Sequence, residues 1–293
     1  MQLRAIGPVL GLLANALAFG LCWWPLREMA SRGLHPLWAT ALMYGMSVAF
    51  ISTIQPGWWR SFVKHPQLWW LFLGSGLTNF GFNWAVTQGD VVRVVLLFYT
   101  MPAWSVLFAW WLLNEAPTRA SLLRLGLALV GVALVLKTPE MDWPLPSSAM
   151  DYLALLGGAS FALNNAMLLK LSHLPTPDRM GGMFSGGMLI TALAAAAGMP
   201  SGLVPWPADV TWWPYLVGLG LCLLLSNMSL QYGAARLPAN TTSLVMLSEI
   251  VFATVSSVLM GVSEMNSRKL AGGVLIVFAA ILATIESHHK ETP

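Results

Sequence analysis

The chain has 293 residues, of which 57% are hydrophobic and only 9% are charged, and its formal net charge is +3. Because a soluble globular domain carries about 25% charged residues, this composition excludes an ordinary soluble protein and indicates a polytopic membrane protein. The pI of about 9.0 rests on few charges in total and does not indicate a nucleic-acid partner.

Ten apolar runs are long enough to cross a bilayer, since a membrane-spanning helix needs roughly 20 residues for about 30 Å of hydrocarbon. They cover residues 5–26, 35–54, 67–88, 91–113, 120–137, 150–170, 181–199, 212–233, 239–261 and 269–286. Each run is continuously apolar, unlike the alternating strands of a membrane barrel, so the sequence predicts an all-α protein with ten transmembrane helices. The first run extends through Trp23 and Trp24, past the usual length of a signal-peptide core, and is predicted to be a retained helix.

The two halves of the chain repeat one another. The segment 77–84 has a counterpart in 225–232, where Asn227 follows Asn79 by 148 residues, and Glu264 follows Glu115 by 149. Five spans in each half would make the second half enter the membrane from the opposite side. The sequence therefore predicts two inverted five-helix repeats, residues 1–140 and 147–293, around a central cavity, an architecture that many secondary transporters use for alternating access.

Basic residues are unevenly divided between the two sides of this topology. If the N-terminus is cytoplasmic, nine of the fifteen Lys and Arg residues fall inside and six fall outside. The positive-inside rule then predicts that both termini are cytoplasmic.

No motif in the sequence indicates a metal, a cofactor or a catalytic centre. All five histidines fall in loops or in the tail, and no H-E-x-x-H pattern is present. Cys22 and Cys222 lie in different halves without metal-type spacing, and are predicted to pack as small apolar residues. The glycine pairs at 181–182 and 186–187 are expected to mark close helix approach. We expect neither an enzyme nor a cofactor.

Polar side chains inside the predicted spans recur at matching places. Asn15 lies one turn before Phe19 in the first span, and Asn164 lies in the corresponding sixth span. Two pairs at spacing four, 79/83 in the third span and 227/231 in the eighth, repeat across the symmetry. Such amides can join helices at about 0.6 kcal/mol each. Their repetition favours a shared site at the midplane.

Two further residues are candidates for gating or coupling. Pro102 removes a backbone hydrogen bond and predicts a kink in the fourth span, close to the aromatic ring of Tyr99. Glu249 is a carboxylate inside the ninth span, where an acid is costly and is a functional candidate by default. Proton carrier, partner of a substrate ammonium and neutral hydrogen-bonding acid all stay open for it. Asp90 and Arg93, at spacing three, are expected to pair at the end of a helical hairpin.

These residues resemble a known family, the ten-helix drug/metabolite transporters whose two five-helix repeats are called EamA domains. The resemblance rests on the segments 99–102, 114–115 and 125–126 of the first half and on 247–253, 264 and 272–273 of the second. Within the family the chain is similar to the bacterial YddG-type aromatic amino-acid exporters. One departure is Ile250, which stands where the family often has proline.

The resemblance implies a bacterial inner-membrane transporter with a central cavity for a small-molecule substrate, and membrane lipid around it. The expected substrate-binding residues are Asn15, Phe19, Asn79, Asn83, Tyr99, Phe161, Asn164, Asn227, Gln231 and Ser243, with Glu249 and Pro102 for coupling or gating. Since no Lys or Arg lies at mid-membrane depth, phosphorylated cargo is disfavoured, and aromatic or large neutral amino acids are expected. A cationic-drug exporter on the same scaffold is the alternative. Coupling to protons and the oligomeric state stay open.

Overall fold

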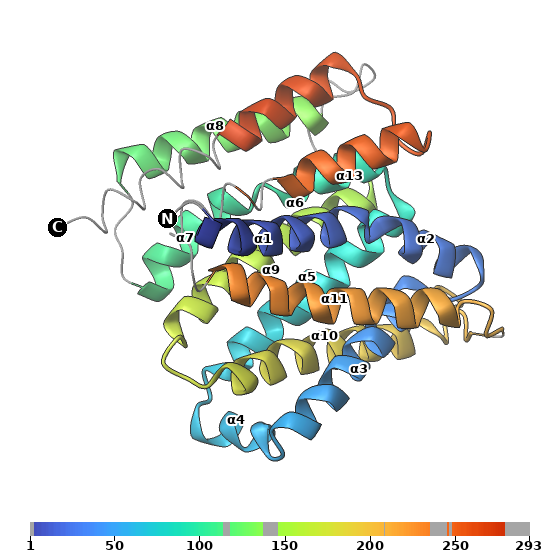
Figure 1. The fold of residues 1–293 in the computed structure, drawn as a ribbon. Coiled ribbons are helices and arrows are strands. Elements are labelled where there is room, and N and C mark those ends of the chain that lie inside the picture. Colours follow the sequence, from blue (N-terminus) through green and yellow to red (C-terminus); the bar gives the residue numbers. More distant parts are fainter. Residues whose placement is uncertain are drawn as a thin grey trace.

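The computed structural model describes residues 3–113, 118–136, 146–207, 209–234, 245 and 248–278. All regular structure within these residues is helical, and most of the long helices run side by side (Figure 1). Helix α1 begins, and the helical segment 267–278 ends, toward the same end of the bundle (Figure 1).

The first half contains α1 Leu3–Leu21, α2 Trp23–Ser31, α3 Pro36–Ile54, η1 Trp58–Arg60, α4 Ser61–Lys64, α5 Leu68–Gln88, α6 Val91–Phe98, α7 Met101–Leu113 and α8 Arg119–Leu136. The second half contains α9 Ala149–Lys170, α10 Thr176–Gly198, α11 Trp213–Ala234, α13 Ser248–Leu259 and the helical segment 267–278. Among the described residues, five stretches are long and apolar enough to cross a membrane, namely Gly7–Ser31, Pro36–Ile54, Val91–Leu112, Thr176–Gly198 and Trp213–Leu230. The predicted segments 239–261 and 269–286 lie partly outside the described residues, and the inverted relation of the halves stays a prediction.

Two of the predicted spans are interrupted, each at four residues before a proline. Helix α1 ends at Leu21, four before Pro25, and α6 ends at Phe98, four before Pro102. A proline has no N–H to donate to the carbonyl four residues earlier, and its ring clashes with that carbonyl. The sequence predicted a kink at Pro102; the interruption lies just upstream of it, because Pro102 is the second residue of α7.

Polar caps begin the helices that follow the turns. The Nδ1 atom of His35 accepts the backbone N–H of Leu37 at 3.3 Å at the start of α3. The Asp90 carboxylate accepts the backbone N–H of Arg93 at 2.7 Å at the start of α6. Each cap satisfies a donor that a helix N-terminus leaves without an internal partner.

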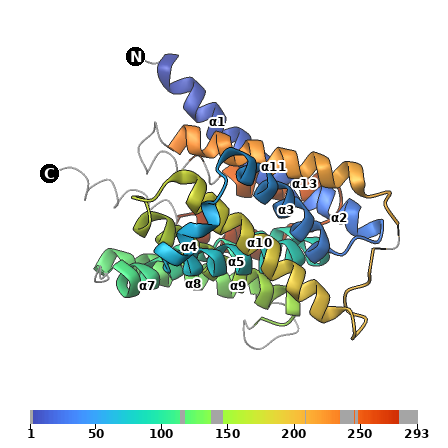
Figure 2. The same ribbon diagram turned by 90° about the horizontal axis from the view of Figure 1, so that it is seen from below.

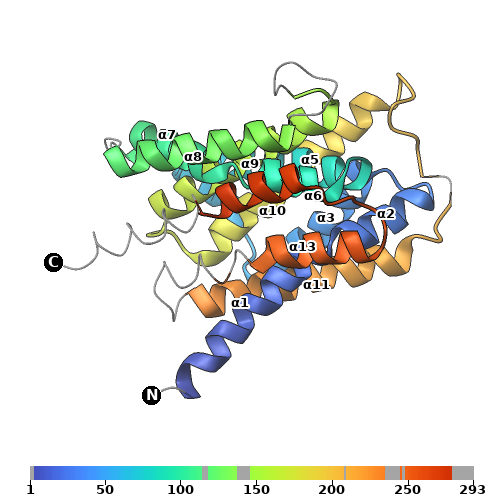
Figure 3. The same ribbon diagram turned by 90° about the horizontal axis from the view of Figure 1, so that it is seen from above.

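The helices pack into two groups. In one, which we call the α1 group, α1 packs mainly against α11 and α13, and α2 continues α1. In the other, the α5 group, α5 packs against α9 and α10, α10 against α3, and α6 and α7 against α9. Figures 2 and 3 show α1, α11 and α13 together on one side, with α5, α7 and α9 on the other. In each group the first helix of one half thus packs on helices from the other half.

Glycines set the closest helix contacts. A methyl group at Gly186 would overlap the Phe72 carbonyl of α5, and one at Gly187 would lie 2.9 Å from the Tyr44 ring of α3. A methyl group at Gly81 would lie 2.5 Å from the Leu153 carbonyl of α9. The predicted role in close helix approach is confirmed for the pair Gly186–Gly187, whereas at Gly182 an added methyl group would meet only ordinary contacts, the nearest at 3.7 Å.

Candidate functional site

The two helix interruptions meet at Glu249, in the first turn of α13. On the α1 side, the closest approach is at Gly20, where a methyl group would lie 2.9 Å from the Glu249 carbonyl oxygen. Cys22, at the interruption, is close enough to Glu249 for their side chains to interact electrostatically. On the α6–α7 side, the Tyr99 hydroxyl and the Glu249 carboxyl interact by hydrogen bonding and charge. All three side chains are buried, with Glu249 8% exposed.

This meeting point has the features of sites in broken transmembrane helices. A regular helix satisfies its own backbone groups, whereas an interrupted one leaves carbonyls and amides free to bind an ion or a solute. Such backbone is tolerated at membrane depth only where protein or water covers it. In this conformation the backbone N–H groups at the interruptions keep partners, because Cys22 donates to Phe19, and Tyr99 and Thr100 donate to Val95 and Leu97. The convergence therefore places a buried titratable side chain between two breaks in the helices.

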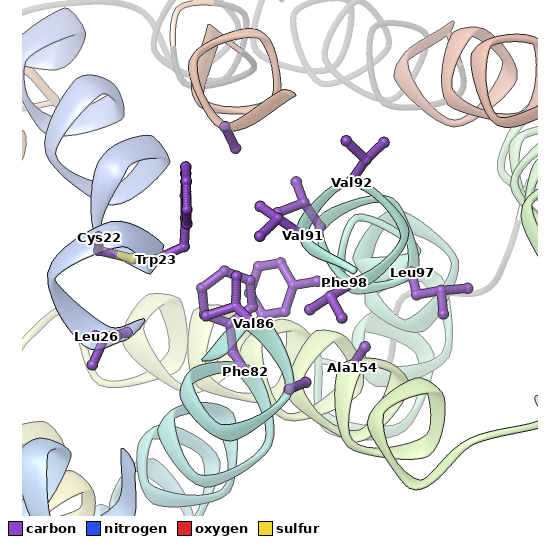
Figure 4. Packing of buried hydrophobic residues seen from close by; sticks show 14 of the residues in the cluster. Cys22, Trp23, Leu26, Phe82, Val86, Val91, Val92, Leu97, Phe98 and Ala154 are labelled. Atoms are coloured by element: carbon purple, nitrogen blue, oxygen red, sulfur yellow. The ribbon is translucent and has the colours of Figure 1, made fainter. Parts of the chain in front are cut away.

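An aromatic cluster adjoins the Tyr99–Glu249 pair. The Phe98 ring lies 4.6 Å from Phe82, 5.4 Å from Phe161 and 5.8 Å from Tyr99, measured between ring centroids. These rings come from α5, α6 and α9, and Figure 4 shows Phe82 and Phe98 side by side in the buried core. Tilted and edge-on pairs of this kind are worth about 0.5–1.5 kcal/mol beyond the area that they bury.

Several buried polar atoms around the central helices have no hydrogen-bond partner among the residues that the structure describes. They are Asn15 Oδ1 on α1, Thr100 Oγ1 at the second interruption and Asn164 Oδ1 on α9. The three residues are at most 3% exposed. An unpaired buried polar group costs about 1–3 kcal/mol, and each of these atoms can still accept a hydrogen bond.

Asn79 and Asn83 are held by helix–helix bonds in this conformation. The Asn79 Oδ1 atom accepts the Tyr44 hydroxyl at 2.7 Å, and its Nδ2 donates to the Ser75 carbonyl at 2.8 Å. The Asn83 Nδ2 atom donates to Thr40 Oγ1 at 3.0 Å. Both amides thus bind α3 and share a face of α5, as their spacing predicts; their part in substrate binding stays a prediction.

The other expected site residues are distributed over both groups. Asn15 donates through Nδ2 to the Ser226 carbonyl at 2.9 Å and to Ser226 Oγ at 2.7 Å, which joins α1 to α11. Phe19 on α1 and Asn227 on α11 are half-buried. Gln231 lies in α11, but its side chain is outside the description, and Ser243 lies outside the described residues.

The interaction expected between Asp90 and Arg93 takes a different form. One Asp90 carboxylate oxygen accepts the Arg93 backbone N–H at 2.7 Å, and the other accepts Lys269 Nζ at 2.9 Å. The Arg93 guanidinium binds the Asp151 carboxylate of α9 at 2.7 and 2.8 Å. A carboxylate at the first turn favours capping, because the free amides there point toward it.

Sequence reasoning missed three residues of the site. Cys22 was assigned to packing alone, Thr100 was passed over, and Tyr44 was not connected with Asn79. One signal was present for Cys22: Pro25 predicts an interruption four residues earlier, as Pro102 does for Phe98. Among the described residues, no group of three or more His, Cys, Asp or Glu could hold a metal ion.

Comparisons with known proteins point to a transporter. The model of the EamA-like transporter family matches residues 6–137. An uncharacterized transporter of Pseudomonas aeruginosa is 23% identical over 238 residues, covering 79% of this chain and 76% of the relative. A crystal structure whose description names no function covers 96% of this chain and 99% of its own, with 20% identity and a TM-score of 0.54, and so shares the fold. The first half of the chain is thus similar to the EamA-like transporter family, and the long apolar helices among the described residues are those of an integral membrane protein.

Proposed function

We propose that this protein is a secondary transporter that exports aromatic or large neutral amino acids across the bacterial inner membrane by alternating access. The observation that carries the proposal is the meeting of two proline-interrupted helices at a buried acid, Glu249, beside four aromatic rings. Discontinuous helices that meet between two repeats near the midplane are a recurrent way to build a transport site. Both termini are proposed to be cytoplasmic.

The chemistry around Glu249 suits a solute that carries an ammonium, a carboxylate and an apolar side chain. Glu249 and Asn164 Oδ1 offer acceptors to the ammonium, and the hydroxyls of Tyr99 and Thr100 can donate to the carboxylate. The rings of Phe82, Phe98 and Phe161 offer an apolar surface for the side chain. Neither set is sufficient alone, because the aromatic rings cannot orient the amino acid and the polar groups cannot distinguish one side chain from another.

Alternating access is supported by the grouping of the helices. The α1 group and the α5 group each combine helices of both halves, and Glu249 and Tyr99 come from different groups. A rocking motion of one group against the other would therefore expose a site between them first to one side and then to the other. Glu249 is proposed to change its partner, Tyr99, substrate ammonium or proton, during this cycle.

Competition for transport in reconstituted liposomes tests the substrate. Phe, Trp, Leu, Ala and a phosphorylated sugar are compared as competitors, with and without a pH gradient. Phe161→Ala should selectively weaken Phe and Trp, since it removes a ring of the cluster, whereas Phe50→Ala on a 39% exposed position is the matched control. Indifference to every amino acid, or preference for the phosphosugar, contradicts the proposal.

A cationic-drug exporter is the second candidate, and Glu249 is the observation that favours it. A buried carboxylate beside aromatic rings can bind a quaternary ammonium through charge and cation–π attraction. A quaternary cation that outcompetes Phe and Trp for transport would move this function to first place.

A further inference from the structure

The turn between α5 and α6 is held by cationic and polar side chains from α2 and from the chain that follows α13. The Arg27 guanidinium of α2 donates through Nε to the Val86 carbonyl at 3.3 Å and through Nη2 to the Gly89 carbonyl. Arg27 therefore caps the C-terminal end of α5, where a helix leaves carbonyls without internal donors and favours positive charge.

The chain that follows α13 holds the other side of the same turn. The Ser263 hydroxyl accepts the backbone N–H of Val92 at 3.4 Å, and Ser263 is 6% exposed. Lys269 Nζ, in the segment 267–278, donates to Asp90 Oδ2 at 2.9 Å and to the Glu264 carbonyl at 3.0 Å. Both side chains of the ion pair are partly buried, with exposures of 15% and 29%.

These bonds have one location in common. Apart from the Tyr99–Glu249 interaction at the candidate site, the hydrogen bonds described above between the α1 group, or the chain just after α13, and the α5 group lie at residues 86–92. The remaining bonds between helices stay within a group, such as Asn15 to Ser226 or Asn83 to Thr40. The Arg93–Asp151 pair likewise joins α6 to α9 inside the α5 group.

We propose that residues 86–92 form one half of a latch, with Arg27, Ser263 and Lys269 as the other half. The closed latch holds the two groups together at this end of the bundle, and its release is required before a solute can enter or leave there. Under the orientation proposed above, this end faces the outside. The inference rests on the proposed alternating access, and it adds the residues that fix which end is closed.

The two sides of the latch differ in strength. Hydrogen bonds from a charged donor are stronger than neutral pairs, and Arg27 reaches two carbonyls of the turn. Lys269 reaches the turn by a single ion pair, which is partly open to solvent and is therefore the weaker part. Loss of Arg27 should therefore open this end more than loss of Lys269.

Thiol accessibility measures the opening without any substrate. Val92 belongs to the latch through its backbone N–H, and its side chain is fully buried, so Val92→Cys, in a chain carrying Cys22→Ala and Cys222→Ala, reports exposure to a polar maleimide. In protein reconstituted into nanodiscs, Arg27→Gln should raise the labelling rate about tenfold, the ratio that about 1.4 kcal/mol produces. The labelling rate of Arg27→Lys should lie between those of Arg27→Gln and the parent, because Lys keeps the charge but loses the guanidinium geometry that reaches two carbonyls.

Arg32→Gln is the matched control. Arg32 lies on the same helix at the same end, pairs with Glu28 at 3.7 Å and stacks on the Tyr215 ring at 4.8 Å, both inside the α1 group. It should leave the labelling rate within about twofold of the parent, because an exposed ion pair inside one group contributes little. Equal rates in Arg27→Gln and Arg32→Gln overturn the latch.

A double-mutant cycle tests the ion pair. Asp90→Asn keeps the acceptor that caps α6, and Lys269→Gln removes only the charge. Each should raise labelling by the same small factor, and the double variant should raise it no further; additive effects contradict the pairing. Since labelling needs no amino acid, a change in labelling without amino-acid transport would refute the proposed substrate and leave the latch standing.

A cross-link keeps the test decisive if a variant folds poorly. Asp90→Cys and Lys269→Cys together, joined by a short bifunctional methanethiosulfonate, should stop transport of the accepted solute, and reductant should restore it. Undiminished transport by the cross-linked protein contradicts the latch.

Discussion

Gly20→Ala probes the contact that brings α1 to α13 at the site. The added methyl group would lie 2.7 Å from Phe252 Cβ and 2.9 Å from the Glu249 carbonyl oxygen. Carbon atoms pack best at about 3.5–4.0 Å, so the two helices must separate by about 1 Å. Two of the three nearest atoms belong to the backbone of α13, which cannot turn aside as a flexible side chain could.

The cost follows from this overlap. Inserting a methyl group into a packed core costs about 1–3 kcal/mol, while replacing a helical glycine by alanine returns up to about 1 kcal/mol of helix propensity. Gly218→Ala in α11 is the control, because no heavy atom of the described residues lies within 4 Å of its added methyl group. Comparing the two variants cancels the propensity gain and leaves the packing loss of about 1–3 kcal/mol.

Two measurements check the prediction. Reversible unfolding in mixed micelles with increasing sodium dodecyl sulfate gives the difference in the free energy of unfolding. Binding of Phe to the folded protein shows whether displacement of Glu249 disturbs the site. If Gly20→Ala is as stable as Gly218→Ala and binds Phe like the parent, the close contact of α1 with α13 at Glu249 is refuted.

Three further outcomes follow from the site and the loops. Glu249→Gln, which keeps the size and the hydrogen-bonding capacity but removes the charge, should slow transport and flatten its pH dependence in liposomes; unchanged rates at every pH contradict a functional acid. Burial lowers the pKa of His35, whose neutral Nδ1 caps α3, so its contribution to stability should be full above about pH 6.5 and be lost as the pH falls toward the lowered value. Between pH 7.5 and 5, the thermal unfolding temperature of His35→Asn should therefore fall less than that of the parent. An equal fall in both proteins would argue against this role of His35. Asp178→Ala should destabilise the protein by about 1–3 kcal/mol, since it leaves Gln55 and Ser61 without the carboxylate that they bind at 2.9 and 2.7 Å, and Asp209→Ala on an exposed loop is its control in the same unfolding assay.

Periodicity and length predicted the helices more successfully than their interruptions. Continuous apolar runs determine helices in a membrane, because every backbone group has to be satisfied within the segment. The interruption at Cys22 was not predicted, although Pro25 contains the information, whereas Pro102 predicted the second one to within a turn. A proline marks the carbonyl that loses its donor, but only packing decides whether the helix bends or ends there.

The candidate site was predicted in part. Glu249 and Tyr99 were selected from the sequence as an isolated acid and an aromatic near a kink, and their interaction across the two groups depends on the fold. The amide pairs were selected by their spacing, which places Asn79 and Asn83 on one face. Spacing along one helix says nothing about which neighbour that face meets.

The sequence by itself determined the membrane setting and the helical segments, because hydropathy and helix formation act between residues close along the chain. Only the tertiary structure decided the partners of the polar side chains. Asp90 binds Lys269, 179 residues away, and Arg27 reaches the end of α5, 62 residues away. A charged side chain in a nearly chargeless bundle binds whatever polar group the packing of the apolar faces brings within reach, and that packing is a property of the whole fold.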